Sequence, residues 1–134
     1  MKQPPLILAI DDDPGRYDEL QRITYGRVRI HVACCEQCVA ERLPECAAVL
    51  LDHDITGEPC TCGEWSTTDD TRPHLPAIAA RGVPVIVTSC SDPDNRRTLT
   101  AAILRGGGHV LQHSANEIQP EMHWLGWLWL QGVL

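Results

Sequence analysis

Short apolar runs recur along the chain, and a stretch with helical spacing follows each of them. The clearest run is Ala47–Leu51, whose uninterrupted apolar residues indicate a strand buried on both faces. The predicted strands are Leu6–Ile10, Arg27–Val32, Ala47–Leu51, Val83–Thr88 and His109–Gln112. The predicted helices are Arg16–Ile23, Cys35–Leu43, Leu75–Arg81, Thr98–Leu104 and a last one from about Gln119 to the end. This alternation predicts an α/β fold with a doubly wound, five-stranded parallel sheet.

The second predicted strand alternates apolar and polar residues, which is typical of an edge strand with one solvated face. A strand order of 2-1-3-4-5 then places the first and third strands side by side. Residues 56–73 are rich in Gly, Thr, Asp and Pro and predict a long loop, which in a compact domain is usually functional or mobile. No repeat or boundary interrupts the pattern, so we expect one domain over residues 1–134.

The amino-acid composition argues against some classes of binding partner. The formal net charge is -7, which disfavours a broad basic surface for duplex DNA. The first apolar run is too short for a signal peptide or a membrane span, so we expect a cytoplasmic protein without a membrane partner. The cysteines are then expected to remain reduced.

Carboxylates gather where two predicted strands end. The first strand is followed by Asp11–Asp13, and the third by Asp52, His53 and Asp54. Carboxylates on one edge of a sheet repel one another unless a cation lies among them. The predicted ligands of a Mg²⁺ or Mn²⁺ ion are Asp11, Asp12, Asp52 and Asp54. Asp13 is the best candidate for a helix cap, and Asp54 could cap the loop instead of binding a metal ion. Because side chains alternate along a strand, His53 is expected to point away from Asp52 and Asp54.

Other polar residues on this edge are suited to a phosphate. Thr88 and Ser89 end the fourth strand, where a hydroxyl can bind a phosphoryl oxygen or begin a helix. Arg96 opens the next helix and contacts either an anion or solvent. Arg16 can fold back on the carboxylates or a phosphate. His53 is a candidate general acid or base, metal ligand or structural hydrogen-bonding residue.

The seven cysteines invite comparison with zinc sites, which need two pairs of ligands that converge. Cys35 and Cys38 fall on a predicted helix and Cys46 precedes a strand, so we expect small buried hydrophobic residues there. Cys60 and Cys62 lie in the loop, but two thiols do not complete a site. The sequence therefore disfavours a structural zinc ion.

Three of the four tryptophans lie in the last eleven residues. As a helix, Met122–Leu130 is apolar around almost its whole circumference, more than one buried face requires. The surplus predicts an exposed aromatic patch, and we expect a homodimer through this Trp-rich helix. The alternative is a helix sheltered by the loop around Trp65.

The chain resembles the receiver domains of two-component signalling at Ile10–Pro14, Asp52 and Val87–Ser89. The resemblance implies a flavodoxin-like fold, a Mg²⁺ ion on the acidic residues and a phosphoryl group on Asp52. Receivers carry a lysine after the fifth strand, whereas the only lysine here is Lys2, and His113 lies near the expected position.

Two motifs resemble a narrower group, the cyclic-phosphate-processing receiver-like domains, which are proposed to act on 2′,3′-cyclic phosphate ends of RNA. Asp11–Arg16 is similar to their DDDPxR run, and Leu51–Ile55 to their LDHDL motif. Their HSxNP motif is altered to Thr88–Pro93, although His113–Asn116 follows the next strand. The candidate catalytic residues are Asp52 with His53 or His113, where His113 is either a coincidence or a replacement of the lost histidine from the neighbouring strand.

Three functions are consistent with these features. The first is a metal-dependent phosphoesterase acting on a cyclic phosphate of RNA or a nucleotide, which the altered HSxNP motif weakens. The second is a stand-alone receiver phosphorylated on Asp52, against which the missing lysine argues. The third is a degenerate receiver that only binds a partner protein. The sequence favours them in this order.

Overall fold

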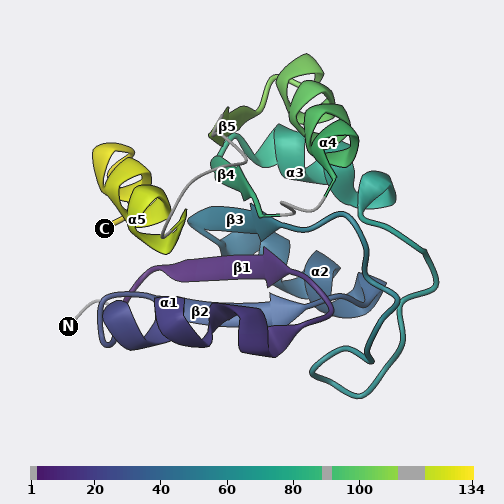
Figure 1. Ribbon diagram of the computed structural model, residues 1–134, viewed down its shortest axis with the longest axis horizontal. Coiled ribbons are helices and arrows are strands. Elements are labelled where there is room, and N and C mark those ends of the chain that lie inside the picture. The colour runs from purple at the N-terminus through teal and green to yellow at the C-terminus, as the bar shows by residue number, and fades with distance from the viewer. Residues whose placement is uncertain (1–2, 89–91, 112–119) are drawn as a thin grey trace.

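Five parallel strands form a single sheet in the order β2-β1-β3-β4-β5 (Figure 1). The structure is a computed structural model and describes residues 3–88, 92–111 and 120–134. The strands are β1 Leu6–Ile10, β2 Arg29–Ala33, β3 Ala48–Leu51, β4 Pro84–Val87 and β5 His109–Leu111. The predicted flavodoxin-like sheet and its strand order are therefore confirmed.

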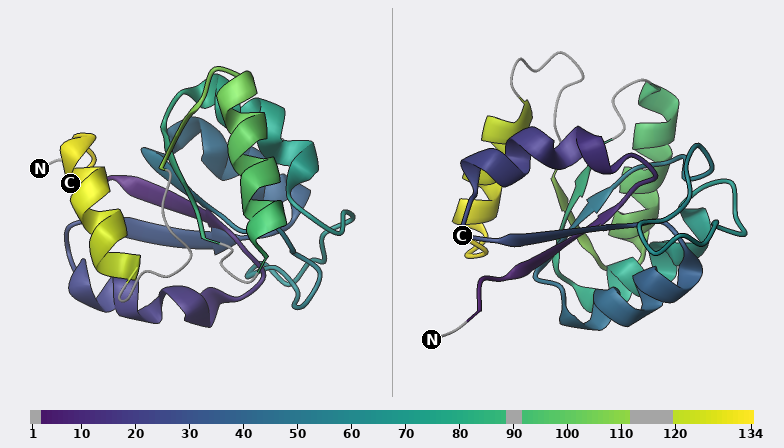
Figure 2. Two further views of the ribbon diagram at one scale, coloured as in Figure 1. Left: turned by 45° about the horizontal axis from the view of Figure 1, so that its top comes forward. Right: turned by 90° about the horizontal axis from the view of Figure 1, so that it is seen from below.

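Helices cover both faces of this sheet (Figure 2). One face carries α1 (Asp18–Ile23) and α5 (Pro120–Leu130). The other carries α2 (Glu36–Arg42), α3 (Leu75–Arg81) and α4 (Pro93–Arg105). Three short 3₁₀ helices, η1 to η3, join these elements at Pro14–Tyr17, Leu43–Glu45 and Arg72–His74.

Strand β1 shows why the central strands have no polar residues. Successive side chains of a strand point to opposite faces, so Ile7 packs in the cluster that contains Leu20 and Trp124, while Leu8 packs in the cluster that contains Val39 and α3. Both Ile7 and Leu8 are fully buried. Burying such a side chain contributes roughly 1.5 to 3 kcal/mol, which explains why no charge appears before the strand ends.

Helix α4 begins five residues before its predicted start. Asp92 is the reason, because its side chain accepts hydrogen bonds from the backbone N–H groups of Asp94 and Asn95 and so caps the helix. Pro93 then occupies the first turn, where its missing N–H costs nothing. Gln112, the last residue of the predicted fifth strand, lies outside the described residues.

Helix α5 is divided between a buried and an exposed side. Trp124 and Leu128 pack against the sheet, whereas Met122, Trp129 and Leu130 are exposed, Trp129 by 66% and Leu130 by 72%. The loop around Trp65 does not shelter them, since it lies at the far side of the molecule (Figure 1). Within the described residues, no helix is long and apolar enough to cross a membrane.

Candidate functional site

The acidic group, defined as Asp11, Asp12 and Asp52, forms where β1 and β3 end together. Ile10 and Leu51 are paired in register, and the Asp52 N–H donates to the Ile10 carbonyl at 3.0 Å. The next residue of each strand therefore leaves the sheet beside the other. One oxygen from each of the three carboxylates lies within 4.8 Å of the other two. The structure thus brings together three of the four predicted metal ligands.

Arg16 lies across two of these carboxylates. Its Nη1 donates to Asp11 Oδ2 at 3.0 Å and lies 3.3 Å from Asp52 Oδ1. The 3₁₀ helix η1 follows the aspartate run directly and turns the arginine back toward it. Both carboxylates are buried, whereas the Arg16 side chain is 38% exposed. The guanidinium thus offsets two buried negative charges from the solvent side.

Asp11 is held by a residue that the sequence analysis assigned only to a helix. The hydroxyl of the fully buried Tyr17 donates to Asp11 Oδ2 at 2.6 Å and lies 3.2 Å from the Thr88 hydroxyl. Burial raises the pKa of Asp11 to about 7; the Tyr17 hydrogen bond opposes this, and the charge of Asp52 adds to it. Near neutral pH the buried carboxyl is therefore close to its midpoint. In the sequence, the hint of this contact with Asp11 is that Tyr17 directly follows Arg16.

Asp12 connects the acidic group to the long loop after β3. Its carboxylate accepts a short hydrogen bond from the Gly57 N–H. A Cβ at residue 57 would lie 2.6 Å from Asp12 Oδ2, so a larger residue there would displace the Asp12 carboxylate. A hollow of about 500 Å³ opens here, with Asp12, Arg16 and Gly57 in its lining. This volume is in the range of small-molecule sites.

Asp54, the fourth predicted metal ligand, does not join the acidic group among the described residues. The regular alternation of β3 ends at Leu51, after which Asp54 forms an isolated antiparallel bridge with Asp70. Its side chain is 76% exposed and lies 2.8 Å from His53 Nδ1. The prediction that His53 points away from Asp54 fails for the same reason.

The remaining predicted residues are distributed around this edge. Thr88 is buried, and its N–H donates to the Leu51 carbonyl at 2.8 Å, which places its hydroxyl near Tyr17. Arg96 lies in the first turns of α4 and is only 9% exposed. Ser89 and His113 lie outside the described residues.

Asp13 precedes η1 as expected, but its side chain makes no capping hydrogen bond. Its backbone N–H instead donates to Asp11 Oδ1 at 3.0 Å. The turn after β1 therefore donates a hydrogen bond to the buried Asp11 carboxylate, and Asp13 does not cap η1.

The donor set fits a small hard cation. Three carboxylates offer the oxygen ligands that Mg²⁺ and Mn²⁺ prefer, and the adjoining hollow leaves room for water or a phosphate oxygen. Burial, with the charge of Asp52 adding to it, raises the pKa of Asp11, and a divalent ion would stabilise the ionised carboxylate in place of water.

Two solved structures share this architecture. A two-component response regulator from Clostridium difficile superposes with a TM-score of 0.62 at 14% identity, covering 95% of each chain. NtrX from Brucella abortus, solved in complex with ADP, gives 0.56 at 18% identity, covering 97% of this chain and 28% of that one. No family model and no curated protein matches the chain. At these identities the likeness shows the fold alone, which is that of response-regulator receiver domains.

Proposed function

We propose that this chain is a receiver-type module that accepts a phosphoryl group on Asp52. One observation carries the proposal: the Asp52 carboxylate lies at the end of the central strand, grouped with Asp11 and Asp12 and 3.3 Å from the Arg16 guanidinium. The receiver fold supports this function over the phosphoesterase that the sequence ranked first.

The chemistry needs a nucleophile and positive charge. A carboxylate oxygen of Asp52 attacks the phosphorus of a phosphoryl donor, the bond to the leaving group breaks, and an acyl phosphate forms. Asp11 and Asp12 would hold Mg²⁺ or Mn²⁺ together with Asp52. When bound, such an ion offsets the negative charge that gathers on the phosphoryl oxygens. Arg16 orients the Asp52 carboxylate and faces the developing charge.

Arg16 can supply the positive charge that the missing receiver lysine would otherwise provide. A receiver lysine would supply a cation beside the phosphorylated aspartate, and the Arg16 guanidinium already contacts both Asp52 and Asp11. Its partly exposed side chain has room to swing outward and bind a phosphoryl oxygen. Guanidinium groups suit this task because their N–H donors match phosphate geometry.

Incubation with acetyl phosphate and Mg²⁺ tests the proposal. We expect the intact protein to gain one phosphoryl group, and the Asp52→Asn variant to gain none. Asp54→Asn is the matched control, because Asp54 follows two residues later but lies outside the acidic group; it should be labelled like the wild type. Absence of labelling in the wild type, or equal labelling of Asp52→Asn, would refute phosphorylation at this residue.

A cyclic phosphodiesterase on the same edge is the second candidate. The observation in its favour is the 2.8 Å contact between His53 Nδ1 and Asp54, because a carboxylate bound to one ring nitrogen orients the imidazole for proton transfer at the other. Its substrates would be 2′,3′-cyclic nucleotides or cyclic-ended RNA. Mg²⁺-dependent ring opening that His53→Gln abolishes would establish this activity. A protein that is stoichiometrically labelled on Asp52 but does not turn over these substrates would exclude it.

The exposed side of α5 is suited to a second copy of the chain. Trp129, Leu130 and Met122 form an apolar patch next to a hollow of about 650 Å³ between α5 and the end of α1. We expect light scattering at micromolar concentration to give twice the mass of one chain, and Trp129→Lys to give a monomer. Trp65→Lys replaces another exposed tryptophan outside the patch and should remain dimeric. A wild-type chain that stays monomeric on concentration would contradict the dimer.

A further inference from the structure

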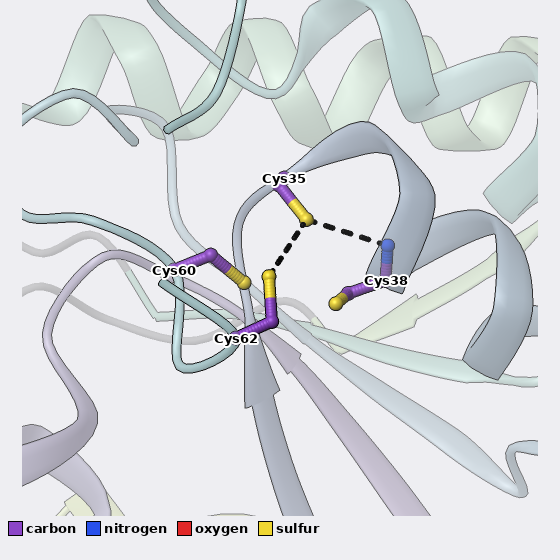
Figure 3. A group of neighbouring side chains, drawn as sticks. All are labelled: Cys35, Cys38, Cys60 and Cys62. Atoms are coloured by element: carbon purple, nitrogen blue, oxygen red, sulfur yellow. Dashed lines mark hydrogen bonds between the residues drawn. The ribbon is translucent and has the colours of Figure 1, made fainter. Parts of the chain in front are cut away.

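Four cysteine side chains converge on one point beside the carboxyl end of β2 (Figure 3). The four sulfur atoms lie within 4.8 Å of one another, and the Sγ atoms of Cys35 and Cys62 are 3.5 Å apart. Cys35 is buried and Cys38 packs against the core, as the sequence predicted, but their sulfurs also meet those of Cys60 and Cys62. Cys35 is the residue before α2 and has an extended backbone, so its sulfur faces the loop instead of the helix interior. The group consists of Cys35, Cys38, Cys60 and Cys62.

We propose that this cysteine group binds one Zn²⁺ ion as a structural site. In a tetrahedral site with Zn–S bonds of about 2.3 Å, neighbouring sulfurs are about 3.8 Å apart. The 3.5 Å between Cys35 Sγ and Cys62 Sγ is close to this value, and all four sulfurs lie within 4.8 Å of one another. Four protein ligands fill the tetrahedron, which leaves no position for a substrate and makes the role structural. This inference does not depend on the proposed phosphorylation.

Backbone N–H groups point at the sulfurs as they do around a bound thiolate. The Cys38 N–H donates to Cys35 Sγ at 3.4 Å, and the Cys34 N–H donates to Cys60 Sγ at 3.3 Å. A thiolate is the form that binds metal.

The loop pair is held in a tight turn. The Gly63 N–H donates to the Cys60 carbonyl at 2.8 Å, and Gly63 has a φ of 93°, which favours glycine. This turn brings Cys60 and Cys62 to the same side in spite of their close spacing. Together with Cys35 and Cys38 they make two ligand pairs from segments far apart in the sequence.

Other described cysteines lie outside this arrangement. The Cys34 sulfur lies 3.9 Å from the Glu58 carbonyl, and the Cys46 sulfur lies 3.2 Å from the Leu43 carbonyl. Cys46 is fully enclosed by core residues and provides a matched control.

The ion would fasten a segment that lacks regular structure. From the end of β3 to η3 the loop has no helix and no strand longer than a single bridge. It contacts the β2–α2 region elsewhere too, since Thr61 donates to the Val32 carbonyl at 2.7 Å and Ser66 to the Glu36 carboxylate at 2.9 Å. The same loop carries Gly57, which binds Asp12. Zinc would thus hold the loop beside the acidic group.

Metal analysis of the purified protein tests the site. Protein produced with added zinc and kept reduced should contain about one Zn²⁺ per chain by mass spectrometry. A Cys38→Ser/Cys62→Ser double variant should lose it, and Cys46→Ser should retain it. Removal of the ion with a strong chelator should lower the thermal unfolding midpoint of the wild type by several degrees, because metal binding contributes to folding.

Co²⁺ binding to the wild-type protein tests the site even if the double variant does not fold. Cobalt added to the chelator-treated wild type should give the intense visible bands of a tetrahedral tetrathiolate complex, and equimolar zinc should abolish them. The proposal is overturned by a wild-type protein without zinc, by stoichiometric iron in its place, by a Cys35–Cys62 disulfide under reducing conditions, or by full zinc content in the folded double variant.

Discussion

Replacing Arg16 with alanine is expected to slow phosphoryl transfer from acetyl phosphate to Asp52 by roughly 10- to 100-fold. The Arg16 guanidinium is the cation that contacts both Asp11 and Asp52, at 3.0 and 3.3 Å. Without it the two buried carboxylates repel each other, and the incoming phosphoryl group loses a charged donor. The rate of mass increase at saturating Mg²⁺ measures the effect.

Arg22→Ala is the matched control for this prediction. Arg22 is an exposed arginine on α1 that forms an ion pair with Glu19, so its loss should leave the labelling rate unchanged. Arg16→Lys retains the charge but not the planar fork and should fall between the wild type and alanine. A labelling rate equal to that of the wild type in Arg16→Ala would show that this guanidinium does not replace the receiver lysine.

Replacing Asp11 with asparagine should make the protein more stable at alkaline pH. Burial, opposed by the Tyr17 hydrogen bond and reinforced by Asp52, raises the pKa of Asp11 from 3.8 to about 7. Between these two values the folded chain binds more protons at this site than the unfolded chain. The free energy of unfolding contributed by this carboxyl therefore falls as the pH rises from about 4 to about 7.

Asparagine has no proton to lose, so the variant should escape this decline. Relative to the wild type, we expect its free energy of unfolding to increase by on the order of 2 kcal/mol at about pH 8, with a much smaller difference at about pH 4. Urea unfolding without divalent cations measures both values. Asp54→Asn removes an exposed carboxylate from the neighbouring strand end and should change neither. A pH dependence of stability that is the same in Asp11→Asn and wild type would contradict the buried-charge account.

The sheet could be predicted because its signal is local. Uninterrupted apolar runs such as Ala48–Leu51 mark strands covered on both faces, and the alternating run at Arg29–Ala33 marks the edge. The strand order then placed Asp11 beside Asp52, since the carboxyl ends of adjacent parallel strands coincide. The early start of α4 was missed because a cap at Asp92 outweighed the lack of apolar periodicity in the first turn.

The parts of the site that could not be predicted depend on the path of the loop. Strand alternation ceases after Leu51, so the position of Asp54 follows from its bridge to Asp70 and not from its distance along the sequence. Cys60 and Cys62 reach α2 through contacts such as Thr61 with the Val32 carbonyl, for which the loop has no periodic signal. Tertiary contacts between segments distant in sequence decided each of these cases.

The most direct measurement of the central claim locates the phosphoryl group on the chain. Protein labelled with acetyl phosphate and Mg²⁺ is reduced with borohydride, which converts an aspartyl phosphate to a homoserine residue, and its peptides are sequenced by mass spectrometry. We expect homoserine at position 52 and unchanged aspartates at positions 11, 12 and 54. Unmodified Asp52, with the phosphoryl group on another residue or absent, would contradict it.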